Sequence, residues 1–245
     1  MFKIFKKYRR LKYGISEKKH GKIELGDVAF LERKNFHAYF KKIKIDPRKT
    51  VSALQSHSNR VAVVNQNSLT RSVVNVDALV CEHPDIFLTI TVADCLPIYF
   101  FDPRLNKIAL SHSGWRGSVK NIVFETVKAM RSNPKDLLVA VGPGIGACHF
   151  EIQSDVLKNF SSYPEFVIKK NKKIFVNLRK IILKQLRILG TPKENVEISK
   201  ECTYCLPDRY FSYRRDKPKV TEAMVAYIGL TSRSRFSLGP DATTD

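Results

Sequence analysis

The 245-residue sequence has no long hydrophobic run. No apolar stretch approaches the roughly 20 residues that a helix needs to cross a bilayer. The basic opening, residues 1–14, is followed by neither a long apolar stretch nor a small-residue cleavage site, which argues against a secretory signal. We therefore expect a soluble, cytoplasmic protein that does not enter a membrane.

Cysteine is too scarce and too irregularly spaced for a disulfide framework. The five cysteines are an odd number in a chain of middling length. They are Cys81, Cys95, Cys148, Cys202 and Cys205. This usage is typical of reduced thiols in a reducing compartment.

Acidic residues are also few, at 23 against 43 Lys and Arg, so the formal net charge is +20. The basic residues are spread along the whole chain, and no helix-turn-helix or RNA-binding signature accompanies them. Such charge runs are usually solvated faces, although a basic surface attracts anions such as phosphate. We expect no specific nucleic-acid partner.

The remaining pattern is that of an ordinary globular protein, with 43% hydrophobic residues. Interleaved strand and helix patterns predict an α/β (α+β) fold, a single domain over 1–245 with mixed β-sheets flanked by helices. It includes a basic segment, 1–19, and an aperiodic tail, 231–245, that we expect to be flexible. The predicted strands are 51–57, 60–65, 85–95, 96–101, 107–113, 136–146, 195–200 and 223–230, and the helices are 30–45, 118–130 (capped by Ser118) and 176–190.

Three residues with metal-binding side chains, His57, Cys95 and His112, lie where predicted strands end. Pro97 is expected to break strand pairing just past Cys95, and Gly114 lets backbone approach a ligand. Two imidazoles and a thiolate suit a catalytic zinc with an open fourth position. Their spacing matches no short metal motif, so they could also be satisfied core groups. Cys95 and His112 alone could form the thiolate–imidazole pair of a cysteine amidase or hydrolase.

Five motifs occur in an order that is highly specific. They are QSH (55–57), TVADCLPIYF (91–100), HSGWRGSV (112–119), GPGIGACHFEI (142–152) and CTYCLPDRYFSYRRD (202–216). Together they closely resemble the laccase-domain family, also called the polyphenol oxidase or purine nucleoside phosphorylase family. The resemblance covers about residues 20 to 230.

The resemblance implies one zinc per chain, bound by His57, Cys95 and His112. It also implies phosphorolysis of adenosine, inosine, guanosine or methylthioadenosine, with adenosine deamination as a further activity. The partners are then a purine nucleoside and phosphate. A multicopper oxidase needs many more imidazoles than the six histidines of this chain supply, so copper and a copper-dependent phenol oxidase are improbable.

Further residues are candidates for supporting roles. Asp94 abuts Cys95 and could act in acid–base catalysis, hold a metal ligand, or close a strand. Arg116, just before a predicted helix, could bind phosphate or form a salt bridge. Asp77, in VDALV, resembles a family position, and the resemblance implies that it orients a histidine. Tyr213 could stack on a purine base beside an arginine that binds an anion, with a buried ion-pair network as the alternative.

Three further features lie within or after the last two motifs. The pair in CTYC (202–205) would need a second pair of ligands to hold zinc, and none stands at a suitable spacing, so both thiols are interpreted as structural. Cys148 and His149 are assigned a packing role. Residues 221–223, Thr-Glu-Ala, replace the Thr-Gly-Arg that commonly follows in the family, which bears on the substrate range.

The scattered charge predicts only weak, sequence-blind association with DNA or RNA. Because such binding rests on counterion release, it should vanish at moderate salt, which a titration of binding against salt concentration measures. Tight binding to a defined RNA, unchanged when His57, Cys95 and His112 are all replaced, would contradict this expectation.

Overall fold

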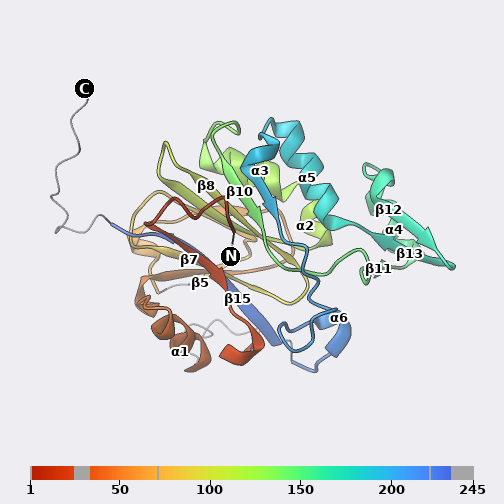
Figure 1. Cartoon of the computed structure of the whole chain (residues 1–245), viewed down its shortest axis with the longest axis horizontal. Helices are drawn as coiled ribbons and strands as arrows, with labels where there is room; N and C mark the ends of the chain where they lie inside the picture. Colours follow the sequence, from red (N-terminus) through yellow and green to blue (C-terminus); the bar gives the residue numbers. More distant parts are fainter. Residues whose placement is uncertain (1, 25–33, 71, 221, 233–245) are drawn as a thin grey trace.

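A computed structural model describes residues 2–24, 34–70, 72–220 and 222–232 of the chain. Within them, two large β-sheets pack face to face and a small third sheet lies to one side (Figure 1). The strands are β1 Leu11–Ile15, β2 Ile23–Glu24, β3 Thr50–Leu54, β4 Val61–Val63, β5 Ser72–Val74, β6 Ala78–Cys81, β7 Phe87–Val92, β8 Leu96–Asp102, β9 Lys107–Ser113, β10 Leu138–Val141, β11 Glu151–Ile152, β12 Val167–Lys170, β13 Lys173–Val176, β14 Val196–Ile198 and β15 Glu222–Leu230.

Both large sheets bring together segments that are distant in sequence, whereas the third contains the hairpin of β12 and β13. The first has the strand order β1-β15-β7-β3-β5, with β2 also paired to β15, and the second has the order β14-β10-β8-β9-β6-β4. The third is β11-β13-β12. Both large sheets are mixed: β3 runs parallel to β7 and β5 in the first, and β10–β14 and β4–β6 are parallel pairs in the second, while the remaining neighbours are antiparallel. The mixed-sheet fold class predicted from sequence is confirmed.

Helices cover the outer faces of both large sheets. The helix α1 packs on the first sheet, whereas α3 and α5 lie together against the second (Figure 1). The helices are α1 Lys34–Lys42, α2 Trp115–Val119, α3 Ile122–Met130, α4 Ser154–Leu157, α5 Leu178–Leu189 and α6 Tyr213–Asp216. Short 3₁₀ turns occupy Lys18–His20, Pro47–Lys49, Gln66–Ser68, Lys158–Phe160, Pro164–Phe166 and Lys193–Asn195.

Strand β8 shows how the sequence specifies these layers. Successive side chains of a strand point to opposite faces. Tyr99 and Phe101 accordingly enter the core between the two sheets, while Ile98 and Phe100 enter the core under α3 and α5. A strand buried on both faces reads as a continuous apolar run, which is why this segment was predictable.

The prediction of a single helix over 118–130 is wrong at its N-terminal end. The segment forms two helices, α2 and α3, separated at Asn121, whose φ of 59° lies in the left-handed region. Ser118 is inside α2 and does not cap α3, because its hydroxyl donates to the Gly114 carbonyl and bonds the Ser113 hydroxyl. Arg116 therefore lies within a helix and not before one.

Pro97 does not interrupt strand pairing as expected. It is the second residue of β8 and pairs with His112 of β9, while the pairing of β8 with β10 starts only at Ile98. Proline is tolerated at the start of a strand because its missing N–H interrupts little of the ladder there.

The remaining predictions are either confirmed or fall on residues that the structure does not describe. The helix predicted over 176–190 is found as α5 and ends at Gly190, whose φ of 88° is the left-handed conformation typical of helix ends. Part of the helix predicted over 30–45 and of the tail over 231–245 falls outside the described residues. The basic opening segment packs into the core through Phe5 and continues into β1. No described helix has the length and apolar character to cross a membrane.

A candidate metal centre in a pocket

The sheet topology brings His57, Cys95 and His112 together. His57 follows β3, Cys95 lies where the chain passes from β7 in the first sheet to β8 in the second, and His112 is the next-to-last residue of β9. The register that pairs Pro97 with His112 sets Cys95 beside that histidine. One ligand atom from each of the three residues lies within 4.8 Å of the others.

A fully buried carboxylate, Asp77, organises two of these three residues. Its Oδ1 atom accepts from His112 Nδ1 at 2.9 Å and from the His57 backbone N–H at 3.0 Å. Its Oδ2 atom accepts from the backbone N–H and the hydroxyl of Ser58 at 2.6 and 2.7 Å. These bonds hold the backbone at His57, where φ is 57°, in a conformation that a non-glycine residue seldom adopts. The expectation that Asp77 orients a histidine agrees with this contact.

The Asp77 contact also selects the ring nitrogen that His112 presents. A carboxylate can only accept, so Nδ1 carries the proton and Nε2 is left as the ligand atom. Metal-binding histidines commonly donate their other ring nitrogen to a carboxylate in this way. The 4% exposed His112 is thus fixed in tautomer and orientation.

Gly114 leaves space for the side chains of Cys95 and His57. A Cβ atom added there would stand 2.8 Å from Cys95 Sγ and 3.2 Å from the His57 ring. Both distances are too short for ordinary contacts, so only glycine fits against the set. The close approach of backbone expected from the GWRG motif is found at this position.

Cys95 and His112 each favour the charged form of the other. Burial alone would raise the pKa of the Cys95 thiol, but the His112 charge and hydrogen bonds from both imidazoles lower it to about 6. Burial likewise opposes the charge on His112, yet the Cys95 thiolate and Asp77 raise its pKa to about 10. Because the thiolate is the form that binds metals and attacks electrophiles, the arrangement can serve either chemistry.

The three residues line one pocket of about 690 Å³. Asp94 and Arg116, the other candidates from sequence, line the same pocket. Its size suits a small organic ligand, since such sites typically span about 300–1,000 Å³. Aromatic and basic side chains complete the wall, and they are Trp115, Phe150, Tyr213, Arg116 and Arg214.

The two pocket arginines are placed differently. The exposed Arg116 stacks its guanidinium over Trp115, 4.4 Å from the ring centre. Arg214 donates to the Glu151 carbonyl at 2.6 Å and lies over Phe150. Both therefore bring positive charge to the pocket wall.

Asp94 accepts three hydrogen bonds through its buried carboxylate. Thr203 Oγ1 donates to Oδ1 at 2.6 Å, and the Ser212 hydroxyl and the Arg214 backbone N–H donate to Oδ2 at 3.0 and 2.7 Å. These bonds attach the segment carrying Tyr213 to the pocket floor. The acid–base role expected for Asp94 stays a prediction.

The two arginines of the last motif have different roles. One fits the pocket wall predicted from sequence, and the other fits the alternative of an ion-pair network. Arg214 and the 56% exposed Tyr213 line the pocket. Arg215 instead donates to the carbonyls of Thr203 and Tyr210 and pairs with Asp216, so it belongs to a structural network.

Sequence reasoning missed part of the wall. Ile145, Phe150 and Leu178 line the pocket from a loop and from the start of α5. Nothing in their local sequence distinguishes them from core residues. Only their positions within the GPGIGACHFEI motif linked Ile145 and Phe150 to the site.

The chain is similar to a known protein family and to several known proteins. Residues 11–231 match the family described as multi-copper polyphenol oxidoreductase laccase. The chain is 32% identical over 199 residues to purine nucleoside phosphorylases of Staphylococcus aureus, covering 76% of this chain and 75% of the relative. A relative in Staphylococcus saprophyticus with the same name is 31% identical over 191 residues, with 73% and 72% covered.

Solved structures agree with these matches. The hypothetical protein YfiH of Bacillus licheniformis has a TM-score of 0.82 at 25% identity, covering 91% of this chain and 94% of that one. The YlmD protein of Geobacillus stearothermophilus has a TM-score of 0.81 at 25% identity, with 92% and 93% covered. Fold and sequence therefore indicate the same family.

The hydrogen bonds of Asp77 predict a measurable effect on zinc binding. Asp77→Asn should lower zinc affinity roughly 10- to 100-fold, because the amide cannot hold the His112 tautomer as the carboxylate does. Competition with a chromophoric chelator measures the affinity.

Asp102→Asn is the matched control for Asp77→Asn. Asp102 is equally buried and accepts backbone N–H groups of Arg104 and Leu105 in the turn after β8, so it shares the stability cost but lies outside the pocket. Equal zinc affinities in the two variants would refute the orienting role.

Proposed function

The chain belongs to the multi-copper polyphenol oxidoreductase laccase family, and from this premise we propose that it is a zinc-dependent purine nucleoside phosphorylase. The observation that carries the proposal is the meeting of His57, Cys95 and His112 in a pocket with basic and aromatic walls. The purine nucleoside phosphorylases to which the chain is 32% identical support the same reaction class.

Zinc fits the donor set better than copper. His57, Cys95 and His112 would supply two nitrogens and one sulfur, leaving a fourth position open for water or substrate. A blue-copper site with two histidines and a cysteine usually adds a weak axial methionine, and no methionine is among the residues that line the described pocket. Bound there, zinc would supply Lewis-acid polarisation of an oxygen atom.

The pocket's own residues would bind and orient two substrates. Arg116 would attract phosphate, and Tyr213 would stack on the purine base. A phosphate oxygen then forms a bond to the ribose C1′ as the bond from C1′ to the base breaks, giving the free base and ribose 1-phosphate. The base leaves with the proton that the attacking phosphate loses, and Asp94 is the residue proposed to relay it.

The substrate range proposed is adenosine, inosine, guanosine and methylthioadenosine, with deamination of adenosine as a further activity. A basic pocket wall suits phosphate, and an aromatic wall accepts any purine because each has a flat π-face. The altered residues 221–223 do not line the pocket as far as they are described: Glu222 begins β15 and pairs with Lys22, and residue 221 lies outside the described residues. The proposed partners are therefore a purine nucleoside and phosphate. We also propose that the protein acts in the cytoplasm.

Turnover of nucleosides tests the proposal directly. Incubation with adenosine and phosphate should yield adenine and ribose 1-phosphate, with inosine as the product of any deamination, all measured by chromatography. Cys95→Ala should lose activity and the zinc bound by this set. If the variant retains both activity and zinc, Cys95 is not a metal ligand. If no purine nucleoside is turned over, the proposed reaction is wrong.

Arg116 is predicted to act on phosphate in particular. Arg116→Ala should raise the KM for phosphate about 10-fold or more, since a charge-assisted hydrogen bond contributes roughly 1.5–3 kcal/mol. Arg104→Ala is the control, because Arg104 lies on the surface beside Asp136, away from the pocket. An unchanged KM in Arg116→Ala would assign Arg116 to the Trp115 stack alone.

The charged Cys95–His112 pair favours a second candidate, a cysteine hydrolase or amidase, and the two can be separated. A hydrolase should survive chelation and be inactivated by alkylation of Cys95. A zinc enzyme should lose activity to a chelator, regain it with zinc, and resist alkylation while metal is bound. The metal-free protein should be alkylated readily at pH 7, because this pH lies above the Cys95 pKa of about 6. His57→Ala discriminates further, since only the zinc enzyme needs that residue.

A further inference from the structure

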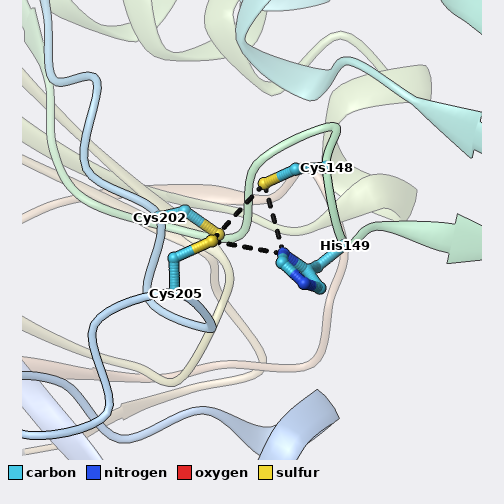
Figure 2. A group of neighbouring side chains, drawn as sticks. All are labelled: Cys148, His149, Cys202 and Cys205. Atoms are coloured by element: carbon cyan, nitrogen blue, oxygen red, sulfur yellow. Dashed lines mark hydrogen bonds between the residues drawn. The ribbon is translucent and has the colours of Figure 1, made fainter.

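A second group of metal-binding side chains lies outside the pocket. Cys148, His149, Cys202 and Cys205 each place one ligand atom within 4.8 Å of the others (Figure 2). None of these four residues lines the pocket. The sequence expectation that no second pair of ligands accompanies CTYC is wrong, because the fold brings Cys148 and His149 to it from more than 50 positions earlier in the chain.

Two parallel strands explain how this group forms. The loop that carries Cys148 and His149 follows β10, and the loop that carries Cys202 and Cys205 follows β14, which pairs with β10 in parallel. Parallel strands end at the same sheet edge, so their following loops meet. A β-bridge between Gly144 and Cys202 extends the contact into the loops.

The distances match those between ligands of a single zinc ion. Two sulfurs bound tetrahedrally at about 2.3 Å from zinc lie about 3.8 Å apart, and a nitrogen and a sulfur lie about 3.6 Å apart. The Cys148 and Cys205 sulfurs are 3.7 Å apart, and His149 Nδ1 is 3.3 Å from each (Figure 2). A metal could therefore enter among these three donors with shifts of a few tenths of an ångström, and the Cys202 sulfur lies within 4.8 Å of all of them.

The surrounding groups hold these side chains in place. The His149 ring stacks on Tyr204, with ring centres 3.9 Å apart and planes 13° apart, which aims Nδ1 at the sulfurs. The Gly146 backbone N–H donates to Cys202 Sγ at 3.1 Å. A Cβ atom on Gly146 would stand only 3.0 Å from Cys148 Sγ, so the loop is shaped around the thiol.

A partly buried arginine matches the charge that such a site would carry. Three thiolates and Zn²⁺ sum to a net charge of −1. Arg179 reaches the loops from α5 and donates to the carbonyls of Gly144 and Glu201 at 2.7 and 2.6 Å. Its Nη1 lies 3.3 Å from the point where a Gly146 Cβ would stand, beside Cys148 and Cys202. A positive charge there stabilises the anionic complex.

We propose that Cys148, His149, Cys202 and Cys205 form a second metal site, which takes a structural zinc ion with all four positions filled by protein. Sites with three cysteines and one histidine are a common form of structural zinc, and the Cys-x-x-Cys spacing at 202–205 supplies half of it. The chain then holds two zinc ions and not the one expected from sequence.

The proposed zinc site would hold part of the pocket wall in place. Ile145 and Phe150, which line the pocket, lie in or beside the loop that carries Cys148. Thr203, between the two later cysteines, donates to Asp94 at 2.6 Å. The ion therefore joins two loops that shape the substrate pocket, without offering an open position to substrate.

A redox disulfide is the alternative use of these thiols. The Cys148 and Cys205 sulfurs would have to approach from 3.7 Å to about 2.0 Å, and the bond would leave Cys202 and His149 without a function. Four converging donors are explained by a metal and not by a pair of thiols.

Zinc content of the full-length protein, expressed with added zinc and measured by mass spectrometry, tests the proposal. Wild type should hold about two zinc ions per chain, and Cys148→Ser, Cys205→Ser and Cys95→Ser about one each. Cys95→Ser/Cys205→Ser should hold almost none. Cys81→Ala, which removes a cysteine outside both groups, should keep two.

Cobalt substitution keeps the test decisive if variants at Cys148 or Cys205 fail to fold. Cys95→Ser loaded with Co²⁺ alone should show the intense visible absorption of tetrahedral cobalt and the near-ultraviolet absorption of cobalt–thiolate bonds. Wild type that holds one zinc, unchanged by Cys148→Ser, would overturn the proposal. So would Cys95→Ser without the cobalt–thiolate absorption, or a Cys148–Cys205 disulfide in the zinc-supplemented protein.

Discussion

The hydrogen bonds accepted by the Asp77 carboxylate are the constraint on which the candidate metal centre depends. One oxygen holds both the His112 ring and the His57 backbone, and the other holds Ser58. A fully buried carboxylate is costly unless it is satisfied, and here every bond that satisfies it also positions the metal-binding set. With its pKa held at about 2, through the donors from His112 and Ser58 that outweigh burial, Asp77 stays charged at any ordinary pH.

The double-sheet architecture supplies the other half of the geometry. Cys95 lies where the chain leaves the first sheet for the second, and the pairing of β8 with β9 sets it next to His112. The loop that follows β10 contributes Ile145 and Phe150 to the pocket wall, and Asp94 ties the segment carrying Tyr213 and Arg214 to the pocket. The proposed metal ligands thus stand at or just beyond the ends of rigid strands, while loops and the short helices α2 and α6 supply much of the pocket wall.

Sequence reasoning was reliable where the signal is local. The doubly buried strand β8 reads as an apolar run, α5 shows a clear helical period, and the three candidate ligands stand at strand ends within specific motifs. It failed where contacts between residues far apart in sequence determine the structure. The break at Asn121 between α2 and α3 depends on a left-handed residue and on Ser118 bonding inward. Nothing near CTYC predicts that Cys148 and His149 lie beside it, because the parallel pairing of β10 with β14 produces that contact.

The central claim is that Asp77 orients His112 so that it binds metal together with His57 and Cys95. Diffraction from crystals of the zinc-loaded protein, recorded on both sides of the zinc absorption edge, tests it most directly. The account predicts an anomalous peak bonded to the Cys95 sulfur, to Nε2 of His112 and to a ring nitrogen of His57, with Nδ1 of His112 still on Asp77. A zinc-loaded crystal without a peak at these three residues, or with His112 turned away from Asp77 to bind through Nδ1, would contradict it.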